Sequence, residues 1–183
     1  YQELLIDNNA LDFDDLLVVT ARLLEEHPAI REKYAERFHH ILVDEFQDTN
    51  IAQYTLLKHL SSYHHNIFVV GDSDQSVYRW RGADYRNIHR FEQDNANTQT
   101  ILLEQNYRSK QNILDAAMAV IQKNENRTHK QLFTDRGEGH KLSYFEASDD
   151  YAEASFIVDT IAQVTSNGIQ PNACAVMYRT NAQ

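Results

Sequence analysis

The sequence is poor in cysteine, proline and glycine, and it contains no long apolar run. Cys174 is the only cysteine in 183 residues, which excludes an internal disulfide framework and fits a reducing compartment. No stretch reaches the roughly 18 consecutive apolar residues that a membrane helix needs, and no secretory leader opens the chain. These absences predict a cytoplasmic protein that makes no contact with a membrane.

Basic residues are also scarce. Lysine and arginine together number 17 against 27 acidic residues, so the formal net charge is −10. Such a chain repels nucleic acid as a whole, and any contact with it must come from a local site. With 42% apolar residues the chain is able to bury a core, in one domain or in two small ones.

Apolar spacing predicts an alternation of helices and strands. Helices are expected at 11–24, 52–60, 84–91, 109–122 and 150–164, and a further short helix is expected directly after Pro28. Ser109 is the expected cap of the helix at 109–122. Strands are expected at 41–43, 67–70, 100–103, 142–145 and 173–178. This order is typical of an α/β fold with a parallel sheet buried on both faces. The polar stretch 123–141 is expected to form a connection with little internal order.

Acidic residues follow two of the expected strands. Asp44 and Glu45 end the first, with Asp48 one helical turn later, and Asp72 and Asp74 follow the second. Sites in parallel sheets form beyond the carboxyl ends of the strands, and carboxylate oxygens suit Mg²⁺. The spacing alone supports metal-dependent phosphate chemistry and ordinary solvated loop or cap residues equally well.

Aromatic and basic residues alternate in YRWR at 78–81. An extended backbone would place Tyr78 and Trp80 on one side and Arg79 and Arg81 on the other. Aromatic faces beside cations are the composition expected of a surface that binds single-stranded DNA. Trp80 is equally compatible with a place in the core.

Several longer sequence motifs are more specific for one protein family than this spacing is. DEFQDTN at 44–50, VVGDSDQSVYRWRGAD at 69–84 and LLEQNYRS at 102–109 resemble the second, third and fourth signature motifs of one family. The family is that of superfamily 1 helicases of the UvrD, PcrA and Rep type, with the PcrA branch the most similar. LDFDDLL at 11–17 and VMYRTNAQ at 176–183 also resemble it, so the resemblance covers essentially the whole chain. It implies an ATP-dependent DNA helicase that moves 3′ to 5′ on a single strand and unwinds duplex in DNA repair or replication.

The resemblance also implies roles in ATP hydrolysis. Asp44 would hold Mg²⁺, and Glu45 would orient and deprotonate the attacking water. Gln75 would contact the terminal phosphate and couple nucleotide state to DNA. Tyr107 would pack on the nucleotide base, and Arg108 would reach the γ-phosphate.

For DNA, the resemblance implies a track for the single strand. Tyr78 and Trp80 would line this track, Arg81 would lie beside them, and Phe13 would help to form a base pocket. Phe13 also fits the buried face of its expected helix. The implied partners are ATP, single-stranded DNA and duplex junctions; the sequence identifies no protein partner.

A phosphate-binding loop of the form G-x-x-x-x-G-K-[ST] is absent, since none of the five glycines precedes a lysine. We therefore expect an internal piece of a helicase with RecA-like parallel sheets. Residues 1–107 would be the later half of the first motor domain, and 108–183 the first part of the second. Alone, the piece is expected to bind nucleotide incompletely, to lack ATP hydrolysis, and to self-associate through an exposed sheet edge.

Three other interpretations remain open. The first is a relative without a phosphate loop that holds DNA or partners without turnover. The second is a Mg²⁺-dependent nuclease that uses the five strand-end acids. The third is a zinc site among the five histidines between residues 39 and 65, although their spacing is unlike that of common zinc sites.

Overall fold

A computed structural model describes residues 1–124 and 127–178. The chain divides into two compact units, residues 1–137 and 138–183, which are described separately. The α-helices of the first unit are α1 (Gln2–Asp7), α2 (Phe13–Glu26), α3 (Pro28–Arg37), α4 (Ile51–Ser61), α5 (Asn87–Asp94) and α6 (Gln111–Ile121). Its short 3₁₀ turns are η1 (Phe46–Asp48), η2 (Ser73–Gln75) and η3 (Arg79–Arg81).

Two short parallel strands form the sheet of the first unit. β1 (Ile41–Val43) pairs with β2 (Ile67–Val69), with Leu42 opposite Phe68, and α4 connects them. This strand, helix, strand unit confirms the expected parallel arrangement. Both strands therefore end at the same edge of the sheet.

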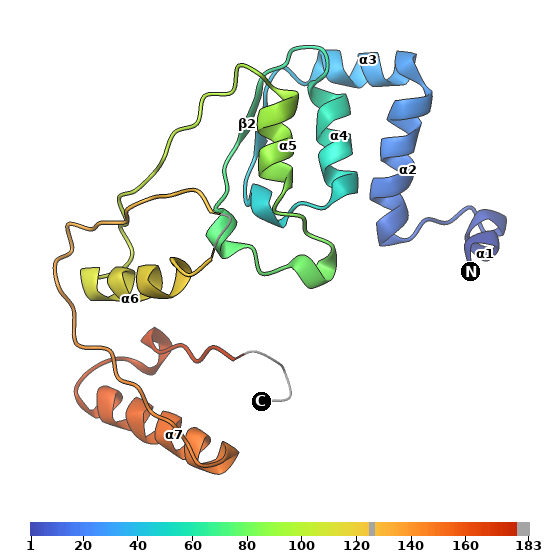
Figure 1. Cartoon of the computed structure of the whole chain (residues 1–183). Helices are drawn as coiled ribbons and strands as arrows, with labels where there is room; N and C mark the ends of the chain where they lie inside the picture. Colours follow the sequence, from blue (N-terminus) through green and yellow to red (C-terminus); the bar gives the residue numbers. More distant parts are fainter. Residues whose placement is uncertain (125–126, 179–183) are drawn as a thin grey trace. The chain divides into compact units, whose positions relative to one another are not determined.

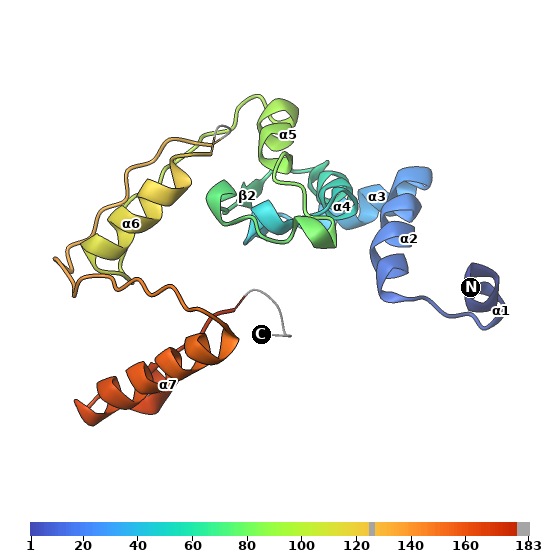
Figure 2. The same cartoon turned by 60° about the horizontal axis from the view of Figure 1, so that its bottom comes forward.

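The core lies between the sheet and the helices that run beside it (Figure 1). Phe46, Tyr54 and Phe91 are buried together, and the rings of Phe46 and Phe91 meet edge to face at 5.7 Å. Val43 and Val69 pack against this cluster from the strands. In both views α4 lies between α2 and α5 (Figures 1 and 2), so it joins the sheet to the N-terminal helices.

The opposite face of the sheet is open, which corrects the expectation that both faces are buried. Leu42 is 75% exposed and Phe68 is 58% exposed, although they are neighbours in register. The physical reason is that α4 and α5 supply apolar side chains to only one face. The open face carries two adjacent apolar side chains.

Local sequence explains where the two central helices begin. Asp12 accepts a hydrogen bond from the backbone N–H of Asp15 at the start of α2, and Asn50 accepts one from Gln53 at the start of α4. In each pair the second side chain also accepts from the backbone N–H of the first residue. These capping boxes satisfy backbone donors that a helix leaves free.

Several expected boundaries are wrong. Residues 100–103, 142–145 and 173–178 form no strand, because strand formation depends on partners that a local pattern cannot supply. α5 begins at Asn87 rather than residue 84, and Lys110 rather than Ser109 is the N-cap of α6. The sequence pattern also missed α1.

The second unit contains α7 (Asp150–Ser166) and the 3₁₀ turn η4 (Pro171–Ala173). Asp149 caps α7 by accepting from the backbone N–H of Ala152 at 2.8 Å. The rings of Phe145 and Phe156 stack at 4.2 Å and anchor the preceding segment on the helix. Across the described parts of both units, every helix is too short or too polar to cross a membrane.

Candidate functional site

The amide of Gln47 connects the residues that follow β1 with those that follow β2. Gln47 is fully buried in η1. Its Nε2 donates to Glu45 Oε2 at 2.8 Å, and its Oε1 accepts from the backbone N–H of Asp72 at 2.9 Å. One side chain thus fixes the spacing between the two strand ends.

The backbone at these strand ends is closely packed. A Cβ added at Gly71 would lie 2.7 Å from Gln47 Oε1 and 3.2 Å from the backbone nitrogen of Phe46, so only glycine fits without a shift. Glu45 has φ of 50°, in the left-handed region that non-glycine residues rarely adopt. This strained residue follows Asp44, whose Oδ1 accepts from the Glu45 backbone N–H at 2.9 Å.

Asp72 and Asp74 do not lie as free carboxylates at the end of β2. The Arg127 guanidinium forms a bidentate contact with Asp74, at 2.7 Å and 3.2 Å. The Lys130 ammonium contacts Asp72 and lies 3.2 Å from Asp74. The side chains of Arg127 and Asp74 are only 3% and 10% exposed, so this ion pair is shielded from water.

Gln75 is attached to the same cluster. Its Nε2 donates to Asp72 Oδ2 at 2.9 Å, while the backbone N–H of Asp74 donates to Asp72 Oδ1 at 3.0 Å. Burial raises the pKa of Asp72, but the hydrogen bonds from Lys130 and Gln75 outweigh it and leave that pKa below its ordinary value. Asp72 is therefore a charged acceptor that orients Gln75.

The position and exposure of the Asp44 carboxylate suit a ligand of Mg²⁺. This carboxylate is exposed at a strand end, and Mg²⁺ in phosphate-transfer sites uses one or two protein carboxylates together with substrate phosphates and waters. The described residues contain no group of three or more histidine, cysteine or acidic side chains placed to hold a metal. Neither the five strand-end acids nor the clustered histidines form such a group of three among these residues.

Tyr107 and Arg108 lie in an exposed turn that is held from both sides. Asn106 Oδ1 accepts from the backbone N–H groups of Arg108 and Ser109, at 3.0 Å and 2.7 Å. Arg136 Nη1 donates to the backbone oxygens of Tyr107 and Arg108, at 3.1 Å and 2.8 Å. The turn is fixed at its backbone while both side chains are exposed.

The aromatic residues near position 80 form a surface cluster around an arginine. Because residues 79–81 form η3, the alternation expected for an extended backbone is wrong. The Arg81 guanidinium lies 4.5 Å from the Trp80 ring centre and 5.2 Å from that of Tyr78. Trp80 is 72% exposed and so is not a core residue.

Phe13 is the first residue of α2 and is 89% exposed. The buried positions of α2 are instead Asp15, Ala21 and Leu24. Phe13 therefore does not lie on the buried face of its helix, which was the alternative explanation for an aromatic residue there. Its proposed contact with DNA bases remains a prediction.

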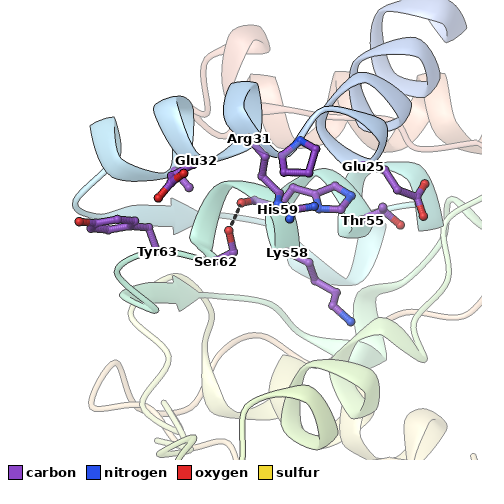
Figure 3. Close-up of a pocket in the computed structure, with 10 residues that line it drawn as sticks. Glu25, Arg31, Glu32, Thr55, Lys58, His59, Ser62 and Tyr63 are labelled. Atoms are coloured by element: carbon purple, nitrogen blue, oxygen red, sulfur yellow. Dashed lines mark hydrogen bonds between the residues drawn. The ribbon is translucent and has the colours of Figure 1, made fainter.

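A separate cleft of about 620 Å³ lies among α2, α3 and α4 (Figure 3). His59 lies at its centre with Arg31 above it, and Ser62 Oγ donates to the His59 backbone oxygen. His59 Nε2 is buried and has no hydrogen-bond partner among the described residues. Burial and the nearby Arg31 charge lower the pKa of His59, which favours the neutral ring. None of the strand-end residues lines this cleft.

The sequence pattern missed the residues that connect the site. Gln47 lies within the DEFQDTN word, but only the fold reveals that its amide reaches Asp72. Arg127 and Lys130 lie in the stretch expected to have little order. Their pairing with residues more than fifty positions away has no local signal.

Two family models together match almost the whole chain. The family model described as the UvrD/REP helicase N-terminal domain matches residues 1–96, and that of the UvrD-like helicase C-terminal domain matches residues 101–183. The chain belongs to the UvrD/REP helicase family. The strand-end acids, Gln75 and the aromatic cluster all lie in the first matched range, and the Arg108 turn lies in the second.

Individual relatives agree with the expected PcrA branch. The chain is 50% identical over 184 residues to the ATP-dependent DNA helicase PcrA of Bacillus subtilis strain 168. It is also 50% identical over 183 residues to the PcrA proteins of Staphylococcus aureus strain Mu50 and Staphylococcus epidermidis. These alignments cover 100% of this chain but only 25% of each relative.

Proposed function

We propose that this chain is an internal segment of an ATP-dependent DNA helicase that translocates 3′ to 5′ on single-stranded DNA. In this proposal, residues 1–107 belong to the first RecA-like motor domain and 108–183 to the second. The network that joins Glu45, Gln47, Asp72 and Gln75 at one sheet edge is the observation that carries the proposal. The PcrA relatives, which are ATP-dependent DNA helicases, support the reaction class.

Hydrolysis of ATP requires a positioned water and stabilisation of the charge that develops on the phosphates. Glu45 orients and deprotonates the water, and its strained backbone and its hydrogen bond from Gln47 fix the direction of the carboxylate. Asp44 holds Mg²⁺, which supplies charge neutralisation to the phosphates when it is bound. Gln75 and Arg108 contact the terminal phosphate, and Tyr107 packs on the base.

For DNA, Tyr78, Trp80 and Arg81 form the contact surface, and Phe13 contributes a second stacking face. Base stacking on aromatic side chains contributes about 1–3 kcal/mol per base and tolerates any sequence. Binding is therefore expected to be independent of sequence, and duplex junctions are proposed as a further partner because the PcrA relatives are DNA helicases. The acidic net charge of −10 makes this local cluster of aromatic and basic groups necessary.

The chain contains no phosphate-binding loop, so we propose that it does not hydrolyse ATP by itself. The complete protein should unwind a duplex with a 3′ single-stranded tail in the presence of ATP and Mg²⁺, and leave a 5′-tailed duplex intact. A complete protein that hydrolyses no ATP with single-stranded DNA present would contradict the proposal.

A second candidate is a relative that binds DNA without turnover because it has no phosphate loop anywhere. Sequencing the gene upstream of the codon for Tyr1 separates the two candidates. A G-x-x-x-x-G-K-[ST] word there supports the motor, and its absence supports the binding protein. The cytoplasmic location and a role in DNA repair or replication remain parts of the proposal.

A further inference from the structure

The segment 127–136 contacts both loops that carry the proposed phosphate-contacting side chains. At its beginning, Arg127 and Lys130 pair with Asp74 and Asp72 in the loop that holds Gln75. At its end, Arg136 donates to the backbone of the turn that holds Arg108. A polar stretch without helix or strand is therefore fixed at two places.

Between these ends, backbone hydrogen bonds join the segment to residues 104–106. The backbone N–H of Phe133 donates to the Glu104 oxygen at 3.1 Å, and that of Asn106 donates to the Phe133 oxygen at 2.7 Å. Glu104 Oε1 also accepts from the backbone N–H of Gln131 at 2.7 Å. These contacts hold the segment 127–136 against residues 104–106 and keep the two from sliding past each other.

The connection to Gln75 passes through one carboxylate. Asp72 accepts from Lys130, from Gln75 and from the Asp74 backbone N–H, and its own backbone N–H donates to Gln47. A charged acceptor that is held by a cation on one side restricts the orientations of the amide on its other side. Removing the cation would leave Asp72 held by fewer contacts and so widen the range of orientations open to the side chain of Gln75.

We infer that Lys130 is a positioning residue for ATP hydrolysis, which acts on Gln75 through Asp72 and connects it to the Arg108 turn through the segment 127–136. The inference rests on the proposed function, since it assumes that Gln75 and Arg108 contact the terminal phosphate. In the proposed division these ion pairs cross from the first motor domain to the second. Lys130, in the proposed second domain, therefore influences the orientation of Gln75, the phosphate-contacting residue of the proposed first domain.

The test uses the complete protein and measures kcat and KM for ATP with saturating oligo-dT. Lys130→Met keeps an unbranched apolar side chain one atom shorter than lysine and removes the charge, and Lys130→Arg retains the charge. Lys123→Met is the matched control, because Lys123 is exposed and lies outside the cluster. Thermal unfolding of each variant separates lost positioning from lost folding.

We expect Lys130→Met to lower kcat by about tenfold, with KM within about twofold and little change in Tm. Lys130→Arg should recover most of the activity, and Lys123→Met should match the unmodified protein. In a Gln75→Ala background, Lys130→Met should cause no further loss, because both changes interrupt one connection.

Two results would overturn the inference while leaving the proposed function intact. One is an unchanged kcat in Lys130→Met when Gln75→Ala is impaired. The other is a loss from Lys130→Met that multiplies fully with the loss from Gln75→Ala, which would mean that the two residues act independently. If the unmodified protein shows no DNA-stimulated hydrolysis, the proposed function fails and this inference fails with it.

Discussion

Gln47 Nε2 donates to Glu45 Oε2 at 2.8 Å, so the orientation of the proposed general base depends on a buried amide two residues away. The same amide accepts from the backbone N–H of Asp72 through its oxygen. One residue therefore fixes both strand ends, and its loss should affect activity and stability together.

Gln47→Met should lower DNA-stimulated ATP hydrolysis of the complete protein by about tenfold, since Glu45 loses the donor that orients it. The partly buried N–H of Asp72 loses its acceptor, which should cost about 1–3 kcal/mol of unfolding free energy. Gln93→Met, an exposed change in α5, is the control. Hydrolysis assays and thermal unfolding check both effects, and full activity in Gln47→Met would contradict the role assigned to the amide.

Binding of oligo-dT to this chain should quench the fluorescence of Trp80, the only tryptophan. Tyr78→Ala should weaken binding by about 1–3 kcal/mol, because one stacking face is lost. Tyr151→Ala removes a tyrosine ring from the second unit, where Tyr151 is 82% exposed against 40% for Tyr78, and should have no effect. The titration is done at low salt, because phosphate contacts weaken as salt rises. Fluorescence that does not respond to DNA would contradict the surface assigned here.

The hydrogen bonds of the Asp84 carboxylate predict how the stability of the protein changes in acid. Arg86 and Arg90 hydrogen-bond its buried carboxylate, at 2.7 Å and 2.8 Å, and hold its pKa well below its ordinary value of 3.8 despite burial. A carboxylate whose folded pKa is depressed contributes stability that is full above its ordinary pKa and is lost as pH falls through the folded pKa. Asp84 should therefore stabilise the protein at neutral pH and progressively less in acid.

Asp84→Asn should accordingly unfold more easily than the unmodified chain at neutral pH, by about 1–3 kcal/mol. The difference should shrink as pH falls toward about 2. Urea unfolding across this range measures it, with Asp7→Asn as the exposed control. A difference that stays constant with pH would mean that the ion pairs of Asp84 contribute nothing.

The open face of the sheet should make the isolated chain self-associate. Leu42 and Phe68 lie side by side on this face, and among the described residues the outer edge of each strand has no partner strand. Light scattering should give a mass that rises with protein concentration, and Phe68→Thr should reduce the rise while keeping a good strand former. A constant monomer mass at high concentration would contradict the prediction.

Local patterns predicted the central strand, helix, strand unit well, because its apolar runs and caps are contained in the sequence itself. β1 and α4 lie within one residue of their expected bounds. Local patterns predicted the wrong structure where a strand depends on a partner strand. Residues 100–103, for example, were expected to form a strand but pair with no sheet in the described part of the chain. The motif words supplied the candidate residues, but spacing could not reveal that Asp72 and Asp74 pair with Lys130 and Arg127. Through those contacts, Asp72 and Asp74 belong to the cluster that holds the side chain of Gln75, although the sequence had suggested that they are metal ligands.

The central claim is that the sheet edge around Glu45 performs ATP hydrolysis, and Glu45→Gln in the complete protein tests it most directly. The amide keeps the shape of the side chain but cannot accept the proton of water, so hydrolysis should fall by about 10²–10⁴-fold while an ATP analogue still binds. Glu36→Gln, on the exposed surface of α3, should remain fully active. DNA-stimulated hydrolysis that survives in Glu45→Gln at the unmodified rate would contradict the account.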